Sequence, residues 1–248
     1  MEAKNHRMLE KALQMLEYIA GQPNGASLPE LCRHLEMPKS SAYSLLMTFW
    51  NMGYLKRGEN GRFIVGMRLF ELGSKFVENS DFFLYARDVL QDLAKTVGET
   101  AHLAALDGGD VVYLGKCEGA HLMRMSSSVG KRLPAYATAL GKALLSGKSQ
   151  AEVRELYRES GLRQITPHTI TDMEQLLVQL EEVRRTGFAF EREESSLGVQ
   201  CAAVPGCQSS GAVYLGLSVA VPVGCSQEGL ERMKQPLQEA RSRLERVL

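Results

Sequence analysis

A serine near the end of the chain lies in a pattern that nearly matches a catalytic motif. Gly216, Ser218 and Ala220 stand where G-x-S-x-G would present a nucleophile. That motif needs a sharp strand-to-helix turn, whereas residues 212–221 alternate as one β-strand and alanine replaces the second glycine. Cys201 as a nucleophile would need an imidazole base, and the spacing of the five histidines nominates none. A hydrolase using Ser218 or Cys201 is therefore a minor alternative, and we expect no enzyme.

The cysteines and histidines also lack the spacing of a disulfide framework or a metal site. The five cysteines are odd in number and widely separated, with no C-x-x-C pair. His102, Cys117 and His121 are expected on neighbouring strands, but without the intervals of zinc ligands. We therefore expect reduced, mostly buried thiols, no metal and no cofactor.

A second set of polar residues has the chemistry of DNA recognition. Pro38 favours a helix start and Gly53 a left-handed helix end, so the sequence predicts a helix over residues 38–52. At helical spacing its outward side carries Ser40, Ser44, Met47, Thr48 and Asn51, and all of these except Met47 are short polar groups. Hydroxyls and amides can hydrogen-bond to base edges in the major groove. An ordinary amphipathic core helix has the same periodicity, so the neighbouring segments must decide.

Those neighbours favour a winged helix-turn-helix. Ser27 and Glu30 have the spacing of a capping box that starts a short helix, and a tight turn leads into residues 38–52. Asn60-Gly61 predicts a hairpin after the second helix, and a first helix over residues 6–20 completes the small core. We expect the recognition helix and the basic wing to contact DNA. The expected contact residues are Lys39, Ser40, Ser41, Tyr43, Ser44, Lys56, Arg57 and Arg62.

Length and composition indicate an ordinary globular protein with two domains. The chain has 248 residues, of which 44% are hydrophobic and 23% charged. We find no apolar run long enough to span a membrane and no signal peptide, and we therefore expect a cytoplasmic protein. Net charge is zero, and residues 1–66 carry eight Lys and Arg against six Glu. So weak a basic excess predicts a homodimer or tetramer, because oligomerisation multiplies the phosphate contacts.

The rest of the chain predicts an α+β domain after a linker helix. We divide the chain into a winged-helix DNA-binding domain (1–66), a linker helix (67–79) and an effector-binding and oligomerisation domain (80–248). In the last domain we expect strands over residues 102–106, 111–117, 122–126, 188–191, 199–204 and 212–221. We expect helices over residues 80–98, 138–146, 149–159, 171–186 and 227 to the end, the last one bent or broken near Pro236. This order indicates an antiparallel sheet flanked by helices.

Several blocks in the right order resemble the IclR family of transcriptional regulators over nearly the whole chain. They are residues 38–41, 53–55, 69–73, 137–145, 193–194 and 198–205. The resemblance implies a winged helix that dimerises and binds promoter DNA, and a GAF-like domain that binds a small effector. Ser44 stands where many members carry arginine, so a bidentate contact to guanine is absent here. The implied function is a ligand-responsive regulator, here a repressor of a catabolic operon.

The resemblance also implies an effector site and a ligand class. The implied residues are Leu122, Met125, Leu133, Ala139, Leu140, Glu191, Val199, Cys201, Ser218 and Ala220. Residues 123–125 and 129–134 resemble members that control sugar-acid catabolism, which suggests a small organic acid such as a keto sugar acid. Its carboxylate would meet the helix start at Ala139 and Leu140, and its hydroxyls would meet Glu191.

Two alternatives to this interpretation remain. The less favoured interpretation of Cys201, Ser218 and Ala220 is that they are ordinary inward-facing strand residues. The chain could also be an architectural DNA-binding protein without ligand control. A second domain as large as residues 80–248, which DNA bending does not require, counts against that possibility.

Overall fold

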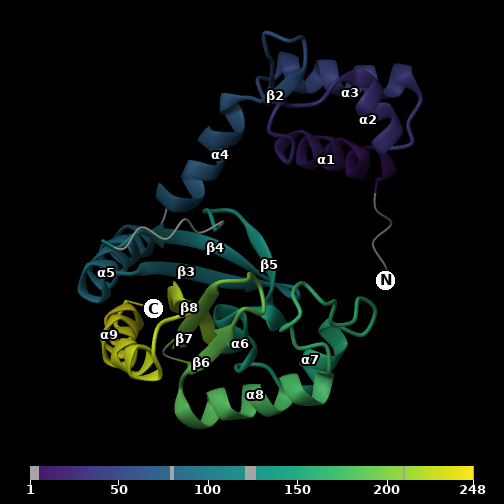
Figure 1. Cartoon of the computed structure of the whole chain (residues 1–248). Coiled ribbons are helices and arrows are strands. Elements are labelled where there is room, and N and C mark those ends of the chain that lie inside the picture. Colours follow the sequence, from purple (N-terminus) through teal and green to yellow (C-terminus); the bar gives the residue numbers. More distant parts are fainter. Residues whose placement is uncertain (1–5, 79–80, 121–126, 209, 248) are drawn as a thin grey trace. The chain divides into compact units, whose positions relative to one another are not determined.

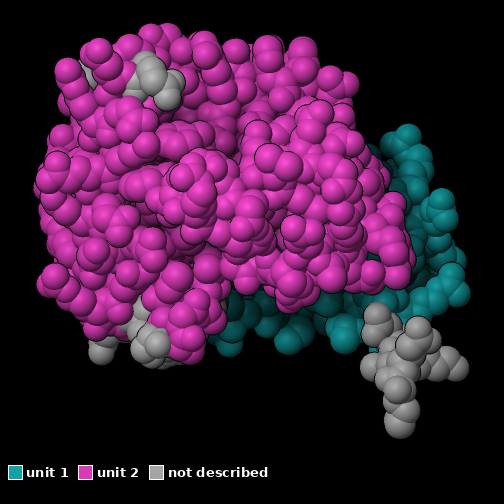
Figure 2. Space-filling view, turned by 90° about the horizontal axis from the view of Figure 1, so that it is seen from below, with its two compact units in different colours: residues 1–80 teal, residues 81–248 magenta. Residues whose placement is uncertain are grey.

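The computed structural model describes residues 6–78, 81–120, 127–208 and 210–247. The chain divides into two compact units, residues 1–80 and 81–248. Figure 1 labels their helices and strands, and Figure 2 distinguishes the two units by colour.

The first unit is the expected winged helix-turn-helix followed by a further helix. Its elements are α1 (Arg7–Ala20), α2 (Leu28–His34), α3 (Lys39–Asn51), β1 (Leu55–Arg57), β2 (Phe63–Val65) and α4 (Met67–Glu78). Strands β1 and β2 form an antiparallel ribbon, which is the predicted wing. The small core is built on buried side chains that include Met15, Ile19, Leu31 and Leu46. Met8, Leu9 and Leu13 of α1 are exposed, so only part of the apolar surface of this helix belongs to the core.

Local sequence explains where the central helices begin and end. The Ser27–Glu30 capping box is present at the start of α2, and Gly53 follows α3 with φ of 79°, a conformation that glycine adopts without strain. Pro38 differs slightly from expectation. It precedes the first turn of α3, with φ of −57° and ψ of 143°, instead of lying inside that turn.

The second unit is an α+β domain built on one antiparallel sheet. Its six strands are β3 (Thr100–Asp107), β4 (Asp110–Cys117), β5 (Arg132–Pro134), β6 (Ala189–Arg192), β7 (Val199–Cys207) and β8 (Val213–Pro222). They lie in the order β5-β4-β3-β8-β7-β6. Its helices are α5 (Asp81–Val97), α6 (Ala139–Leu145), α7 (Gln150–Leu156), α8 (Met173–Thr186) and α9 (Gln227–Glu245), with the short 3-10 helix η1 (Ala135–Ala137) before α6.

Several details of this unit differ from the sequence-based expectations. The strand expected over residues 122–126 lies outside the described residues, and β5 was not predicted because it is too short to show alternation. Helix α7 ends at Leu156 instead of residue 159. Helix α8 begins at Met173 instead of residue 171 and is capped by Asp172, whose side chain accepts from the Gln175 amide. Helix α9 runs unbroken through Pro236.

Alternation along the strands gives each face of the sheet its own core, and Figure 1 shows the helices that pack on the sheet. Leu217 and Val219 of β8 face the core formed with α5 and α9. Ala203 of β7 belongs to the core formed with α6 and α8 on the other face, and Cys201 packs against that core. Ser218 of β8 is paired with Ala203 and with His102 of β3, so Ser218 and His102 lie with Cys201 on the α6 face of the sheet.

Candidate functional site

A cavity of about 50 Å³ lies between the α6 face of the sheet and the start of α6. All six strands border it, because β5, β4, β3, β8, β7 and β6 each contribute a side chain. The lining residues are His102, Tyr113, Ser127, Leu133, Thr138, Ala139, Leu140, Glu191, Ser195, Ser196, Val199, Cys201 and Ser218.

Most of the expected effector-site residues meet in this cavity. Those present are Leu133, Ala139, Leu140, Glu191, Val199, Cys201 and Ser218. Leu122 and Met125 lie outside the described residues. Ala220 does not line the cavity. It is buried opposite Thr100 and Cys201, and its methyl group is too short to extend the wall beyond Ser218.

Glu191 is the acidic group of the cavity. It is only 4% exposed, and its carboxyl accepts from the Glu194 amide at 2.9 Å and from Ser195 Oγ at 3.4 Å. Burial raises the pKa of Glu191 to about 7, although the Glu194 amide and the Cys201 thiol act in the opposite direction. The Glu191 carboxyl can therefore both donate and accept a hydrogen bond near neutral pH.

His102 faces the same cavity from β3 and was not predicted as a site residue. It is 2% exposed, and its Nε2 lies 2.8 Å from Ser127 Oγ. Burial lowers the pKa of His102 to about 4, with Lys116 contributing, so the ring is neutral near pH 7. Tyr113 packs edge-on against the ring, with the centroids 5.2 Å apart.

The other residues that the prediction missed are polar or aromatic: Tyr113, Ser127, Thr138, Ser195 and Ser196. Strand parity within the sequence did not by itself point to His102. His102 and Ser218 are directly paired across β3 and β8, so they point to the same face of the sheet. That pairing joins distant parts of the chain and was not visible in the sequence.

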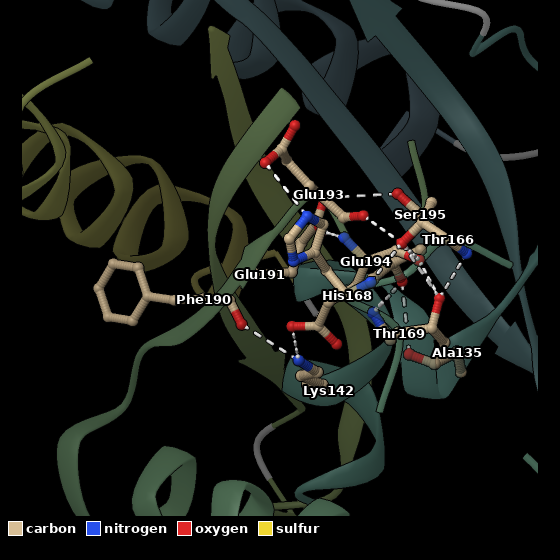
Figure 3. A network of polar contacts seen from close by, with 12 residues as sticks. Ala135, Lys142, Thr166, His168, Thr169, Phe190, Glu191, Glu193, Glu194 and Ser195 are labelled. Carbon is tan, nitrogen blue, oxygen red and sulfur yellow. Dashed lines mark hydrogen bonds and ion pairs between the residues drawn. The ribbon is translucent and has the colours of Figure 1, made fainter. Parts of the chain in front are cut away.

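No lysine or arginine among the described residues lines the cavity. Lys142 of α6 is a buried cation outside this lining; it is 1% exposed and donates to Glu194 at 2.5 Å (Figure 3). Burial lowers the pKa of Lys142, and Glu194 partly offsets this effect. The second oxygen of Glu194 is buried without a hydrogen-bond partner among the described atoms.

Two threonines fix the loop that positions Glu191 and Glu194. Thr166 Oγ1 donates to the carbonyl of Glu193 at 2.5 Å, and Thr169 Oγ1 donates to the carbonyl of Glu194 at 2.7 Å. Figure 3 shows both side chains against this loop. Glu193 has φ of 58°, which is unfavourable for a residue with a Cβ, so the two threonine contacts help to hold a strained turn in place.

The first unit presents the polar surface that the sequence predicted. Lys39, Ser40 and Ser44 are exposed on α3, Tyr43 is 52% exposed, and Ser41 is half-buried. Lys56 and Arg57 are exposed on β1 of the wing. These groups can reach phosphates and base edges.

Arg62 was expected beside them as a phosphate contact, but its guanidinium already has protein partners. It donates to Glu30 at 2.6 Å and to the carbonyl of Gly25 at 2.9 Å. The Ser27 amide and then Arg62 lower the pKa of Glu30 to about 2. Arg62 therefore ties the wing to the start of α2.

A winged-helix unit followed by a sheet domain with a small cavity is the arrangement of a ligand-responsive transcriptional regulator. Residues 8–59 match the IclR helix-turn-helix domain, and residues 74–246 match the C-terminal domain of bacterial IclR transcriptional regulators. The chain belongs to the IclR family of transcriptional regulators and is not an enzyme.

Individual relatives agree with this assignment. The chain is 36% identical to the regulator KdgR of Dickeya chrysanthemi over 203 residues, which are 82% of this chain and 67% of KdgR. It is 33% identical to the regulator XynR of Escherichia coli K12 over 242 residues, 97% of this chain and 96% of XynR. An IclR homolog from Microbacterium hydrocarbonoxydans, solved in complex with 4-hydroxybenzoate, superimposes with a TM-score of 0.82 at 26% identity, covering 97% of this chain and 98% of that one.

Within the described residues, no helix is long and apolar enough to cross a membrane. In the same part of the chain, no three His, Cys, Asp or Glu side chains are grouped as metal ligands.

Proposed function

We propose that this chain is a homo-oligomeric repressor that binds operator DNA through residues 1–66 and responds to a small hydroxylated organic acid bound by residues 80–248. The observation that favours this ligand class is the cavity lining, where hydroxyl, imidazole, thiol and carboxyl groups converge without a cationic side chain among the described residues. Such a lining suits a ligand with several O–H groups better than one with two carboxylates.

The DNA contacts in this proposal come from α3 and β1. Lys39, Ser40, Ser41, Tyr43 and Ser44 would enter the major groove, and Lys56 and Arg57 would contact phosphates. Arg62 is proposed to act indirectly, by fixing the wing through Glu30 and Gly25.

The ligand carboxylate is proposed to meet the backbone amides of Ala139 and Leu140. These two residues begin α6, so their N–H groups have no acceptor within the helix. Glu191, Cys201 and Ser218 would hydrogen-bond to the ligand's oxygen groups. The cavity volume of about 50 Å³ is well below the roughly 300 Å³ of small ligand sites. Binding would therefore move lining side chains, so the ligand-bound and ligand-free conformations of the chain would differ. A ligand that binds one conformation more tightly shifts the chain toward it, and this shift would change the affinity for DNA.

Calorimetry with ligands of different classes tests the proposal. Three classes of ligand are titrated into the wild type and Glu191→Ala: aliphatic hydroxylated monoacids, dicarboxylic acids and the aromatic acid 4-hydroxybenzoate. Operator release is followed by gel shift. We expect hydroxylated monoacids to bind the wild type most tightly, to bind Glu191→Ala at least tenfold more weakly, and to release DNA. Tighter binding of dicarboxylic or aromatic acids, or unchanged affinity in Glu191→Ala, would contradict the ligand assignment. Failure of every acid to bind would favour ligand-independent DNA binding.

A further inference from the structure

The start of α1 and the turn between α2 and α3 border a groove of about 630 Å³ in the first unit. Arg7 and Lys11 of α1 line it, together with Glu36 of the turn and Ser41 of α3. We propose that Arg7 and Lys11 bind the sugar-phosphate backbone of operator DNA, on the side of α3 that lies away from the wing. This inference rests on the proposed function and adds a second backbone contact to it.

The groove and the wing lie on opposite sides of the recognition helix α3. Ser41 lines the groove, and the ring of Trp50 packs against Phe63 of β2, with the centroids 6.4 Å apart. Trp50 follows Ser41 by nine residues, which is about two and a half turns of an α-helix, so their side chains point in opposite directions. Ser40 and Ser44 are exposed and lie between these two sides, facing outward.

This arrangement matches the surroundings of a helix in the major groove of DNA. The major groove is about 12 Å wide, and a helix with its side chains is about 10–12 Å across, so a phosphate backbone runs along each side of the helix. Lys56 and Arg57 of the wing contact one backbone in the proposed function. Arg7 and Lys11, on the other side of α3, contact the second backbone, and the outward hydroxyls between them reach base edges.

The basic side chains at the start of α1 have donors for phosphate oxygens. Arg7 is exposed. Lys11 Nζ donates to the carbonyl of Leu35 at 2.8 Å, which uses one of the three N–H groups of the ammonium and holds it beside the turn that precedes α3. His6 Nδ1 accepts from the Leu9 amide, so in the neutral ring Nε2 carries the proton and can donate. These groups therefore provide a cluster of phosphate ligands at one end of the groove.

Glu36 distinguishes a phosphate from a cationic ligand in this groove. Its side chain is exposed in the same lining, and a carboxylate repels a phosphate but attracts a cation. Two observations favour DNA as the occupant. The groove is continuous with α3 through Ser41, which is a proposed DNA contact, and its basic side chains outnumber the single acidic one.

The experiment measures binding of the full chain to two fluorescent duplexes of equal length over a range of salt concentrations. One duplex is the operator that the wild type selects from a random-sequence library, and the other is unrelated. We expect Arg7→Ala to weaken binding to both duplexes about fivefold at about 0.15 M salt and to lower the salt slope by about 1. Arg7→Lys keeps the charge and should stay within about twofold of the wild type. Arg7→Ala combined with Lys11→Met should lower the slope by about 2.

Glu36→Gln provides a change in the opposite direction. Removal of this carboxylate should tighten binding to both duplexes about twofold. Glu17→Gln is the matched control, because it removes the same charge ten residues after Arg7 on the same helix, which is about 15 Å further along its axis. Glu17→Gln should leave the affinity for DNA unchanged.

Several results would overturn this inference. Unchanged DNA binding in Arg7→Ala, while Arg57→Ala lowers the salt slope, would refute the second backbone contact and leave the proposed function intact. Weaker DNA binding in Glu36→Gln would refute it as well. Dissociation of the Arg7→Ala oligomer in sedimentation velocity would assign the groove to a second copy of the chain, and a lower unfolding midpoint of Trp50 fluorescence would make Arg7 a structural residue. A wild type that binds neither duplex would refute the proposed function itself.

Discussion

Glu191 contributes a residue-scale dependence of stability on pH. Its pKa is raised from 4.5 to about 7 in the folded chain, so the folded state binds this proton more tightly than the unfolded state. The contribution is complete below pH 4.5, is lost as pH rises to about 7, and amounts to roughly 3 kcal/mol. The stability of Glu191→Gln should therefore not fall in this way between pH 4.5 and 7. Urea unfolding followed by circular dichroism between pH 4.5 and 8 tests this, and an equal loss in Glu191→Gln would contradict it.

His102 contributes a dependence of stability on pH in the opposite direction to that of Glu191. Its pKa is lowered from 6.5 to about 4, so the unfolded state binds this proton more tightly. Stability from the neutral ring is complete above pH 6.5 and is lost toward pH 4, again by roughly 3 kcal/mol. His102→Gln should remove this acid sensitivity. Between pH 4.5 and 6.5 the effects of Glu191 and His102 on the free energy of unfolding partly cancel, so each single variant must be measured to separate them. If His102→Gln remains as acid-sensitive as wild type, another group is responsible.

At the scale of elements, the buried pair of Lys142 and Glu194 joins α6 to the loop after β6. Lys142→Met removes the cation and leaves the Glu194 carboxylate buried without it. We expect a loss of about 3–5 kcal/mol. Lys142→Met combined with Glu194→Leu should recover most of that loss, because neither charge remains. Urea unfolding of the two single variants and the double variant measures the coupling. A loss below about 1 kcal/mol in Lys142→Met would show that Glu194 finds another partner or a proton.

The wing offers a matched pair of arginines. Arg57 is exposed, whereas Arg62 is tied to Glu30 and Gly25. Arg57→Ala should weaken binding to all DNA sequences and reduce the salt slope by about 1, without changing unfolding of the first unit. Arg62→Ala should lower the unfolding midpoint. Trp50, the single tryptophan of the chain, reports this unit by fluorescence because it packs against Phe63 of β2.

One result for Arg62→Ala would contradict the structural role assigned to Arg62. If Arg62→Ala leaves the Trp50 unfolding midpoint unchanged and reduces the salt slope as Arg57→Ala does, then Arg62 contacts phosphate directly. Its hydrogen bonds to Glu30 and Gly25 would then contribute little to the wing.

At the scale of the whole molecule, exposed apolar residues on α4 point to self-association. Met67 and Phe70 are each 70% exposed, and apolar surface of this kind favours a protein partner. Phe70→Glu should shift the chain toward smaller species in sedimentation velocity at micromolar concentration and weaken operator binding. Glu71→Gln, on the same helix, serves as the control. An oligomer that is unchanged by Phe70→Glu would show that other surfaces hold it together.

The sequence by itself determined the elements that depend on neighbours along the chain. Helical spacing and the glycine at 53 located α3, the Ser27–Glu30 spacing located α2, and Asn60-Gly61 located the wing. Strand alternation gave most of the sheet, and the family resemblance supplied seven residues that do line the cavity. These signals are local because capping, turn geometry and side-chain periodicity act over a few residues.

Only the tertiary structure decided which distant residues meet. The pairing of β3 with β8 placed His102 opposite Ser218, and the fold of the wing placed Arg62 against Glu30. The fold also buried Lys142 beside Glu194, and burial is the main cause that lowers the pKa of Lys142. These outcomes depend on strand order and on desolvation, which are properties of the packed chain and leave no periodic signal in the sequence.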